Sequence, residues 1–410
     1  MGDSPSAGFA YLFERFPSFT QTFCFREVME MRRQGVECPI WAIRDPSDEP
    51  RQDFPTELAG LTRYIPGSFE EKLETDAVFR RKARKAIGEL CELWGGESEK
   101  RRIYEALWLL PALREAGVSH VHVHFAGTAA RTAFWLKRLG GIHYSFTAHA
   151  NDIFCDEPHE RLEMLIRDAE CVVTVSDFSV RFLSERFPEH SGKFHRVYNG
   201  IHVDHFKRSE PDDSRPLVLA VGRYIEKKGF ADLVAACRLL GERPFECLIV
   251  GQGPLEEPLR AAAASDPRIQ ITGPKSEDEI ITLLARASIF ALPCVDEEGG
   301  GKDNLPTVIM EAMAAAVPVI STPIAGVPEM VENGVTGLLV APHDVDGLAK
   351  ALAELLDAPA RGRELGAVGR RVCEEKFATT RTTAELRAIL ARHGAFNPSK
   401  GGLLARFFRK

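Results

Sequence analysis

Two basic residues follow an apolar segment in the second half of the chain, within the sequence GRYIEKKG at 222–229. Arg223 and Lys228 therefore stand between a predicted strand and the start of a predicted helix. The first N–H groups of a helix lack partners within it and its dipole is positive at that end, so phosphate binds there readily. Two cations beside such a helix predict a diphosphate site, with solvated surface cations as the alternative. A Walker loop is excluded because no Gly-Lys-Ser/Thr sequence is present.

An acidic pair lies further along the chain, in the segment 299–340. A glycine run is followed by Asp303, and Pro306 suits the first turn of a helix that carries Glu311. Glu311 stands among Ile, Met and Ala residues, and a carboxylate buried there needs a partner. The two hydroxyl groups of a ribose would be such a partner. A capping or salt-bridged glutamate is the alternative.

Glycines mark two further turns where a backbone can approach a phosphate. Gly251 and Gly253 follow a predicted strand, but Glu256 stands where a dinucleotide fingerprint has its third glycine. This pair therefore indicates a tight turn beside a nucleotide rather than a nicotinamide site. Gly127 stands at a strand-to-helix turn in the first half of the chain.

Histidines gather near two predicted strand ends in the first half. His149, with Asp152 close behind it, follows one strand, and a purely structural histidine is the alternative reading. His120, His122 and His124 share one face of another strand, which raises the possibility of a metal site. Because no carboxylate or cysteine partner is evident in the sequence, we expect no metal there.

The elements that carry these residues alternate between β-rich and helical segments. Strands are predicted in the second half at 217–222, 245–251, 269–273, 288–293 and 317–322, and in the first half at 9–13, 120–125, 143–148, 171–176 and 193–199. Residues 69–116 are predicted to be helical. Apolar strands that alternate with amphipathic helices indicate parallel sheets covered on both faces.

The chain of 410 residues is long enough for two domains. A polar segment closed by prolines, 201–216, marks the boundary. We expect an α/β protein with two doubly wound domains facing across a cleft, at 1–205 and 206–385, followed by a C-terminal helix and basic tail at 386–410. In such sheets ligands bind beyond the carboxyl ends of the strands.

Composition narrows the class of protein. Hydrophobic residues at 44% and charged residues at 27% are typical of a globular chain, and a net charge of -7 argues against general nucleic-acid binding. No apolar run reaches about 18 residues, and the N-terminus lacks the pattern of a signal peptide. The nine cysteines contain no Cys-x-x-Cys, which favours reduced thiols. We therefore expect a cytoplasmic protein.

Taken together, these segments resemble the retaining GT-B glycosyltransferases of family 4, especially those of exopolysaccharide and lipopolysaccharide assembly. The resemblance covers nearly the whole chain and rests on RFPSFTQTF, HVHFAGTAA, FTAHANDIF, YNGIHVDHF, GRYIEKKG, GQGPL and the segment 299–340. It implies two Rossmann-like domains, with the donor nucleotide held mainly by the second. It also implies a nucleotide-sugar donor, UDP-sugar being favoured over GDP-sugar, a saccharide or polyprenyl-linked acceptor, and no metal or nucleic acid.

The resemblance also implies roles for individual residues. Arg223 and Lys228 would hold the diphosphate, Glu311 the ribose, and His149 would lie near the donor sugar and its anomeric centre. Asp303 stands where the family's Glu-x7-Glu motif has its first glutamate, a departure that we read as a variant. The implied catalytic residues are His149, Asp303, Arg223 and Lys228, and the implied donor-binding residues are Gly127, Arg223, Lys228, Gly253, Asp303, Asn304, Leu305 and Glu311. Gln21 stands where the subgroup often has glutamate, which leaves an acceptor role for its loop open.

Two other functions stay open at this point: a sugar-nucleotide epimerase of the same fold and a non-catalytic, two-lobed small-molecule binding protein. Same-face attack and double displacement are also not separated, since no enzyme nucleophile stands out. A lipid-linked acceptor would require the protein to act at the surface of a bilayer. The segments 79–94 and 403–410 combine basic and apolar residues, so we expect peripheral contact with an anionic membrane, with packing of the apolar stripe on the domain as the alternative.

Overall fold

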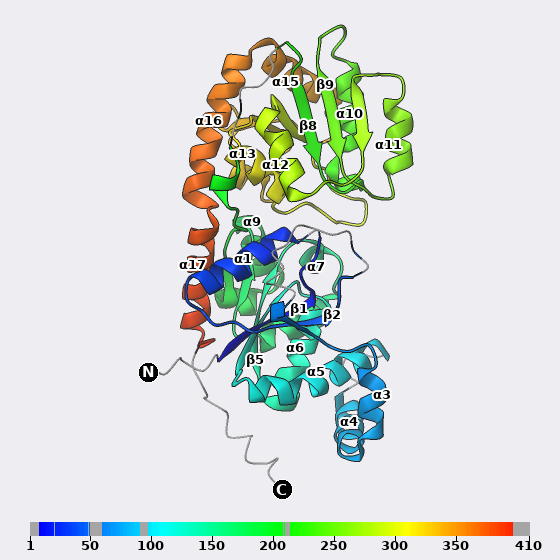
Figure 1. The fold of residues 1–410 in the computed structure, drawn as a ribbon, viewed down its shortest axis with the longest axis vertical. Coiled ribbons are helices and arrows are strands. Elements are labelled where there is room, and N and C mark those ends of the chain that lie inside the picture. The colour runs from blue at the N-terminus through cyan, green and yellow to red at the C-terminus, as the bar shows by residue number, and fades with distance from the viewer. Residues whose placement is uncertain are drawn as a thin grey trace. The chain divides into compact units, whose positions relative to one another are not determined.

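A computed structural model describes residues 8–19, 21–47, 49, 60–90, 97–207, 209 and 214–396 (Figure 1). The chain divides into two compact units. Among the described residues, unit 1 contains those up to Val175, Val180–Val197 and those from Thr383 onward, and unit 2 contains Ser176–Ser179 and Tyr198–Thr382. None of the helices in the described ranges has the length and apolar character needed to cross a membrane.

Unit 1 is built on a seven-stranded parallel sheet in the order β3-β2-β1-β4-β5-β6-β7. The strands are β1 (Phe9–Arg15), β2 (Ile40–Arg44), β3 (Thr62–Tyr64), β4 (His120–His124), β5 (His143–Ala148), β6 (Val172–Thr174) and β7 (Phe194–Arg196). The helices are α1 (Thr22–Arg33), α3 (Phe69–Thr75), α4 (Ala77–Leu90), α5 (Glu97–Glu115), α6 (Thr128–Gly140), α7 (Asn151–Phe154), α8 (His159–Asp168), α9 (Asp177–Arg186) and α17 (Thr379–Arg392).

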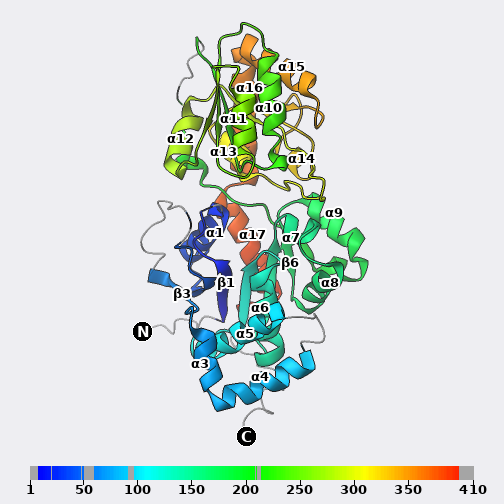
Figure 2. The ribbon, with the colours of Figure 1, turned by 90° about the vertical axis from the view of Figure 1, so that its right-hand side faces the viewer.

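Alternate side chains of β1 enter two different cores, as expected for a strand buried on both faces. Phe9, Tyr11 and Phe13 pack with residues of α1 and with Leu386 and Leu390 of α17. Ala10 and Leu12 belong to the opposite core, which contains residues of α5 and α6. Figure 2 shows α5 and α6 together and α1 near α17.

Unit 2 has a six-stranded parallel sheet in the order β10-β9-β8-β11-β12-β13. Its strands are β8 (Leu217–Val221), β9 (Glu246–Val250), β10 (Ile269–Thr272), β11 (Ile289–Leu292), β12 (Val319–Ser321) and β13 (Gly337–Leu339). Its helices are α10 (Phe230–Arg238), α11 (Glu256–Ala263), α12 (Glu277–Arg286), α13 (Thr307–Ala314), α14 (Val327–Met330), α15 (Val345–Asp357) and α16 (Pro359–Lys376).

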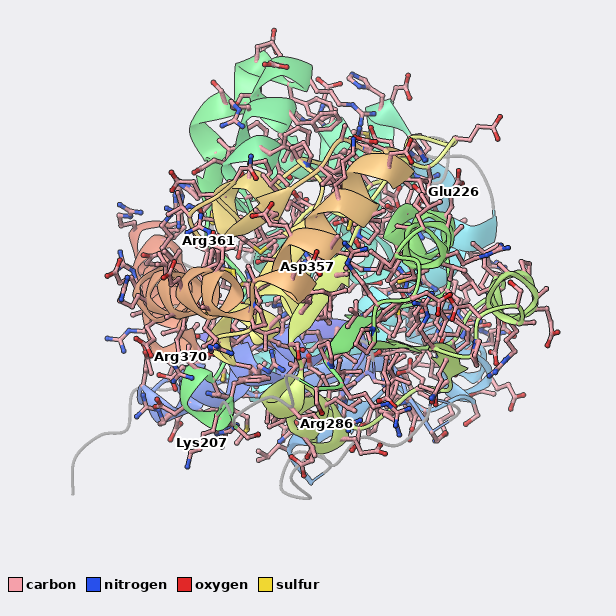
Figure 3. The ribbon with its side chains drawn as sticks, turned by 90° about the horizontal axis from the view of Figure 1, so that it is seen from above. Lys207, Glu226, Arg286, Asp357, Arg361 and Arg370 are labelled. Carbon is pink, nitrogen blue, oxygen red and sulfur yellow. The ribbon has the colours of Figure 1, made fainter. Side chains whose placement is uncertain are left out.

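Two groups of helices flank the sheet of unit 2. Helix α10 contacts α11 and α15, whereas α13 contacts α12 and α16. Arg370, labelled in Figure 3, connects α16 to the end of α13: its guanidinium donates to the backbone carbonyls of Phe206 and Ala314 and pairs with Glu374. The prediction of two Rossmann-like, doubly wound parallel sheets is therefore confirmed.

The ten strands predicted from the sequence are all present, most of them shorter by one or two residues at an end. Strands β2, β3 and β13 were not predicted. The chain passes to unit 2 after Val197, ahead of the boundary expected at 205. It returns after Thr382, so the C-terminal helix expected at 386–410 is present in α17 and packs on unit 1, whereas residues 397–410 lie outside the described residues.

Both sheets reverse their strand order next to the first strand of the unit. The reversal lies between β1 and β4 in unit 1 and between β8 and β11 in unit 2. In open α/β sheets, ligands bind beyond the carboxyl ends of the strands at this switch point. Within each unit, the loops after these two strands are therefore the first place to look for functional side chains.

Candidate functional site

The loop after β8 carries the predicted diphosphate residues. Arg223 is exposed, whereas Lys228 is only 9% exposed and ends the 3-10 turn η4 (Glu226–Lys228). Gly229 then starts α10 with φ +64°, and a Cβ atom there would lie 1.8 Å from the carbonyl oxygen of Pro293. Only glycine fits this backbone without strain. Gly229 therefore allows the turn that places Lys228 directly before the helix.

Lys228 and Asp303 form an ion pair across the switch point of unit 2, because Lys228 lies in the loop after β8 and Asp303 lies in the loop between β11 and α13. Their side chains are 11% and 15% exposed. Burial raises the pKa of Asp303, but the Lys228 ammonium outweighs burial and, with smaller contributions from Lys227 and Arg223, holds this pKa below its usual value. Asp303 is therefore ionised at neutral pH and Lys228 is held in a defined position.

Gly251 and Gly253 are explained by packing of the loop after β9 against the loop after β8. A Cβ at Gly251 would lie 1.8 Å from the carbonyl oxygen of Gly222, and one at Gly253 would lie 2.6 Å from that of Tyr224. Tyr224 in turn donates its hydroxyl to the carbonyl of Ile249 at 2.9 Å. These glycines bring the two backbones together and thereby support the segment that carries Arg223.

Around α13 the predicted donor-binding residues are largely buried. Asn304 is 2% exposed and its Oδ1 accepts a hydrogen bond from the Ser176 hydroxyl at 2.6 Å, while its carbonyl accepts from Gly326 N–H at 2.9 Å. Leu305 is 6% exposed and Glu311 is 7% exposed. The helix begins at Thr307, one residue later than the predicted helical position of Pro306, which serves as its N-cap.

In unit 1, His149 follows β5 and its backbone is fixed by Asp152. The Asp152 carboxylate accepts N–H donors from Ala126, Ala150 and His149 at distances of 2.7–3.2 Å. Burial raises the pKa of Asp152, although the backbone donors oppose this shift. The His149 ring packs against the rings of Phe23 and Phe125, with centroids 4.7 and 4.4 Å away. Asp152 therefore positions His149 rather than standing beside it as a second reactive group.

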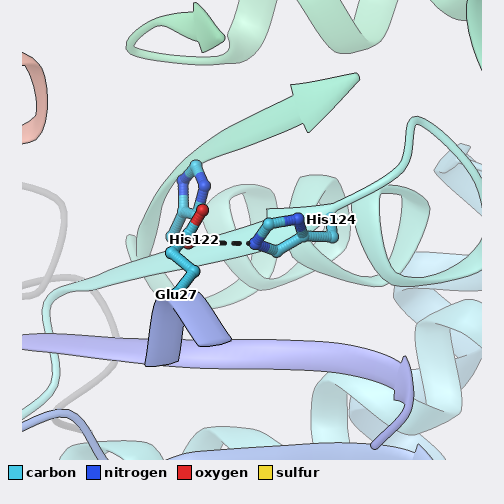
Figure 4. A group of neighbouring side chains, drawn as sticks. All are labelled: Glu27, His122 and His124. Carbon is cyan, nitrogen blue, oxygen red and sulfur yellow. Dashed lines mark hydrogen bonds and ion pairs between the residues drawn. The ribbon is translucent and has the colours of Figure 1, made fainter. Parts of the chain in front are cut away.

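The histidines of β4 meet a carboxylate that we did not anticipate. Glu27 of α1 accepts from His124 Nε2 at 3.1 Å (Figure 4). Donor atoms of Glu27, His122 and His124 lie within 4.8 Å of one another, close enough for a metal ion. The expectation that no carboxylate accompanies these histidines was therefore wrong, because α1 packs on the strand face that carries them. Both ring nitrogens of His122, however, are hydrogen-bonded to the hydroxyls of Ser145 and Thr147.

The sequence analysis did not single out Glu27 as a functional residue, although the residue pattern of α1 contains a signal for it. Cys24, Val28 and Met31 repeat at helical spacing and all three are buried, and Glu27 falls on the same stripe. A carboxylate on an apolar helix face needs a partner.

The predicted residues divide between the units. Arg223, Lys228 and Asp303 gather at the switch point of unit 2, with Gly253 supporting their loop and Asn304, Leu305 and Glu311 on or before α13. Gly127 and His149 belong to unit 1. Gly127 is the N-cap of α6, and a Cβ there would meet no atom within 4 Å, so packing within the described residues does not require a glycine at this position.

The chain resembles known proteins in both of its units. The family described as "Glycosyltransferase Family 4" matches residues 20–205, and "Glycosyl transferases group 1" matches residues 215–358. The amylovoran biosynthesis glycosyltransferase AmsK of Erwinia amylovora is 30% identical over 303 residues, which cover 69% of this chain and 74% of AmsK. The chain belongs to glycosyltransferase family 4.

Other proteins resemble the chain over more of its length. The putative colanic acid biosynthesis glycosyltransferase WcaL of Salmonella typhimurium is 28% identical over 83% of this chain and 88% of its own. Among solved structures, sucrose-phosphate synthase from Thermosynechococcus elongatus has a TM-score of 0.71 at 17% identity, covering 94% of this chain and 99% of that one. The fold is thus that of GT-B glycosyltransferases, and the chain is a glycosyltransferase.

Proposed function

We propose that this glycosyltransferase moves a hexosyl group from a nucleotide-sugar to a saccharide or polyprenyl-linked acceptor, with retention of anomeric configuration, in cell-surface polysaccharide synthesis. Relatives support the sugar-polymer context, since WcaL and AmsK are named for colanic acid and amylovoran. Support for the donor is divided. A Corynebacterium glutamicum relative, 29% identical over 65% of this chain and 74% of its own, is named a GDP-mannose-dependent mannosyltransferase. The structural neighbour HepE of Anabaena is described as a complex with UDP and glucose. We favour a UDP-sugar.

The observation that carries the proposal is the Lys228–Asp303 pair at the switch point of unit 2. Arg223 and Lys228 together bring two positive charges against one carboxylate, next to the start of α10. This excess of positive charge and the N–H groups of the helix suit a diphosphate. Asp303, ionised and held by Lys228, is suited to accept hydrogen bonds from hydroxyls of the donor sugar.

In the proposed reaction, the bond between the anomeric carbon and the diphosphate oxygen breaks as the acceptor oxygen bonds to the same face of that carbon. The acceptor hydroxyl loses its proton to the departing phosphate oxygen, so atoms and charge balance without an enzyme nucleophile. Arg223 and Lys228 stabilise the negative charge that develops on the diphosphate, an effect that is strongest where water is excluded. We propose that this charge is met without a metal ion.

Donor binding is tested by titrating UDP and GDP into the protein and into Arg223→Ala and Lys228→Ala. Each variant should bind the preferred nucleotide about 10- to 150-fold more weakly, as expected for loss of one charge-assisted hydrogen bond. Arg286→Ala and Lys350→Ala are matched controls, since both residues are exposed and lie on α12 and α15. Unchanged affinity in both site variants would overturn the assignment. Sugar transfer should also release one nucleoside diphosphate for each acceptor glycosylated, which an epimerase would not do.

Membrane contact is a second part of the proposal, and the packing of α4 determines which of its residues are available to lipid. Phe79 and Ala83 are buried in the core of unit 1 and Ile87 packs against it, so this face of the helix is not available to lipid. Arg80, Arg81 and Arg84 are exposed. Leu93, Trp94 and the segment 403–410 lie outside the described residues, as do the side chains of Lys82, Lys85 and Leu90. We therefore propose an electrostatic contact through the exposed arginines of α4.

This contact is tested by sedimentation with vesicles of phosphatidylcholine alone or of phosphatidylcholine mixed with anionic phosphatidylserine. Binding should require the anionic lipid, fall with salt, and weaken when Arg80, Arg81 and Arg84 become Gln, since each surface cation contributes about 1 kcal/mol. The control replaces the exposed cations Arg238, Lys350 and Arg371 of unit 2. Equal loss in both triple variants, or equal pelleting with both vesicles, would contradict the proposal.

A further inference from the structure

Besides Lys228, the Asp303 carboxylate has a second side-chain partner at the switch point of unit 2, the thiol of Cys294. Cys294 lies two residues after the end of β11 and is fully buried. Its Sγ lies 3.6 Å from Asp303 Oδ2, the same carboxylate oxygen that pairs with Lys228 Nζ. Among the described residues, the two side chains that bond the Asp303 carboxylate therefore meet at one oxygen, and Oδ1 is bonded by neither.

We propose that Cys294 is a positioning residue: together with Lys228 it holds Asp303 by Oδ2 and so leaves Oδ1 for a hydroxyl of the donor sugar. This inference rests on the proposed function, in which Asp303 accepts from that sugar. A carboxylate has two equivalent oxygens and rotates readily about its last bond, so one ammonium partner does not decide which oxygen is used. A second donor on the same oxygen does decide it.

The thiol is the donor in this contact. Asp303 is ionised, because the Lys228 ammonium outweighs burial and holds the pKa of this carboxyl below its usual value, and an ionised carboxylate only accepts. Burial and the Asp303 carboxylate raise the pKa of the Cys294 thiol well above its usual value, so the thiol keeps its proton. The S–H group therefore donates to Oδ2, and both lone pairs of Oδ1 remain available.

Cys294 is itself held by the end of the sheet, which makes it a rigid reference for the carboxylate. Its carbonyl accepts a hydrogen bond from the hydroxyl of Thr322, the residue directly after β12. The next residue, Val295, donates its N–H to the Lys227 carbonyl at 3.1 Å. Cys294 thus lies where the segments that follow β8, β11 and β12 are joined.

Asp303, by contrast, ends a loop that bonds mainly to itself. Between Cys294 and Asp303, Glu297 N–H donates to the Gly301 carbonyl and Gly300 N–H donates to the Glu297 carbonyl, each at 2.8 Å. Gly300 is exposed and has a φ of +82°. The hydrogen bond from Cys294 is therefore a direct link between the end of the sheet and the Asp303 side chain.

The oxygen that remains suits a neutral donor group of a ligand. The Asp303 side chain is 15% exposed whereas Cys294 is fully buried, so a ligand reaches the carboxylate and not the thiol. In the proposed complex Lys228 contacts the diphosphate, and the sugar is bonded to that diphosphate, so the carboxylate beside Lys228 faces the sugar. An ionised oxygen repels phosphate and accepts from a hydroxyl.

Packing alone is the competing explanation for a buried cysteine at this position. Cys247 offers a matched comparison, since it is also fully buried in unit 2. It is the second residue of β9 and therefore lies toward the amino end of its strand, away from the carboxyl ends that carry the donor site. Replacing either cysteine by Ala removes the same atom from a buried position, but only Cys294→Ala removes a donor to Asp303.

The binding arm compares Cys294→Ala with the native protein by calorimetric titration. The ligands are the UDP- or GDP-hexose that the native protein binds and the matching nucleoside diphosphate. Without the thiol, the Lys228 ammonium can bridge both oxygens of Asp303 and draw Oδ1 from the sugar. The ratio of the dissociation constant for the hexose conjugate to that for the diphosphate should therefore rise about 2- to 10-fold, the range for loss of one hydrogen bond. Cys294→Ser keeps a donor and should restore most of the native ratio, and Cys247→Ala should leave the ratio unchanged.

The contact itself is measured without substrate, from the S–H stretching band in the infrared difference spectrum of native protein and Cys294→Ser. Because the acceptor is charged, this band should lie at lower frequency than the Cys247 band, obtained in the same way from Cys247→Ser. A Cys294 band no lower than that of Cys247, or an unchanged ratio in Cys294→Ala, would overturn the inference and leave the proposed function standing. A native protein that binds no nucleotide-sugar would overturn the proposed function and the sugar contact together.

Discussion

Replacing Lys228 by Met separates the two tasks that we assign to this side chain: binding a diphosphate and neutralising Asp303. Met keeps much of the aliphatic stem, which lies over Gly222, where a Cβ would be 3.2 Å from Lys228 Cε. It removes the charge that reaches Asp303. Affinity for a nucleoside diphosphate should then fall, whereas affinity for the corresponding nucleoside should not.

The expected loss follows from one charge-assisted contact. Such a hydrogen bond contributes about 1.5–3 kcal/mol, which corresponds to a roughly 10- to 150-fold change in Kd. The value should fall within this range because Lys228 is only 11% exposed and solvent screens it weakly. Isothermal titration with UDP, UMP and uridine measures the three affinities. Lys350→Met is the matched control on α15.

The same substitution has a second, pH-dependent effect on stability. In the native protein the pKa of Asp303 is held below its usual value, so the pair stabilises the fold above the unfolded pKa of about 3.9 and this stabilisation is lost as pH falls. In Lys228→Met, burial dominates and raises the pKa of Asp303. The difference in Tm between native protein and variant should therefore be larger at pH 7 than at pH 4. Equal weakening of UDP and uridine binding, or a Tm difference independent of pH, would refute the reasoning.

Four other changes test separate parts of the account. Transfer should continue in EDTA; loss of activity that manganese restores would contradict proposed metal independence. Glu311→Gln should weaken UDP binding about tenfold, the size of one charge-assisted contact, with the exposed Glu354→Gln as control. Gly253→Ala should lower the free energy of unfolding by about 1–3 kcal/mol, and with it Tm, because its Cβ would lie 2.6 Å from the Tyr224 carbonyl oxygen. Gly273→Ala should not lower Tm in this way, because a Cβ there has open space. Hydrogen bonds from His143 and Lys137 lower the pKa of Glu170 to about 2. Glu170→Gln should therefore lower Tm at pH 7, and the loss in Tm should shrink as pH falls from about 4 toward 2. A loss in Tm that does not change with pH would exclude this link between Glu170 ionisation and stability.

Most strands were predictable because their segments are rich in β-branched, aromatic or other apolar residues and lie between turn residues. The prediction for β5, 143–148, matches the structure at both ends: two glycines lie shortly before HYSFTA, and a polar segment follows it. Strands β3 and β13 span three residues each and were missed, although the equally short β6, β7 and β12 were predicted. Strand β2 was missed although IWAIR is apolar and four of its five residues are buried. That signal was present in the sequence.

The loops that carry the candidate site residues were predictable, since each of these loops follows a strand. The contacts between residues of different loops were not predictable. Lys228 and Asp303 are 75 positions apart and meet only because β8 and β11 are neighbours in the sheet. Glu27 and His124 are 97 positions apart and meet because α1 packs on the histidine face of β4. Strand order and helix placement decide both contacts, and local patterns in one sequence do not contain that information.

The central claim is transfer of a sugar with retention from a nucleotide-sugar. It is tested most directly by incubating the protein with a panel of UDP- and GDP-hexoses and a bacterial lipid-linked oligosaccharide fraction. Mass spectrometry and the anomeric coupling constant in ¹H NMR then identify the product. We predict an α-linked product from an α-linked donor, with one nucleoside diphosphate released per linkage and activity lost in Lys228→Met. A β-linked product, or donor consumption without a glycosylated acceptor, would contradict the account.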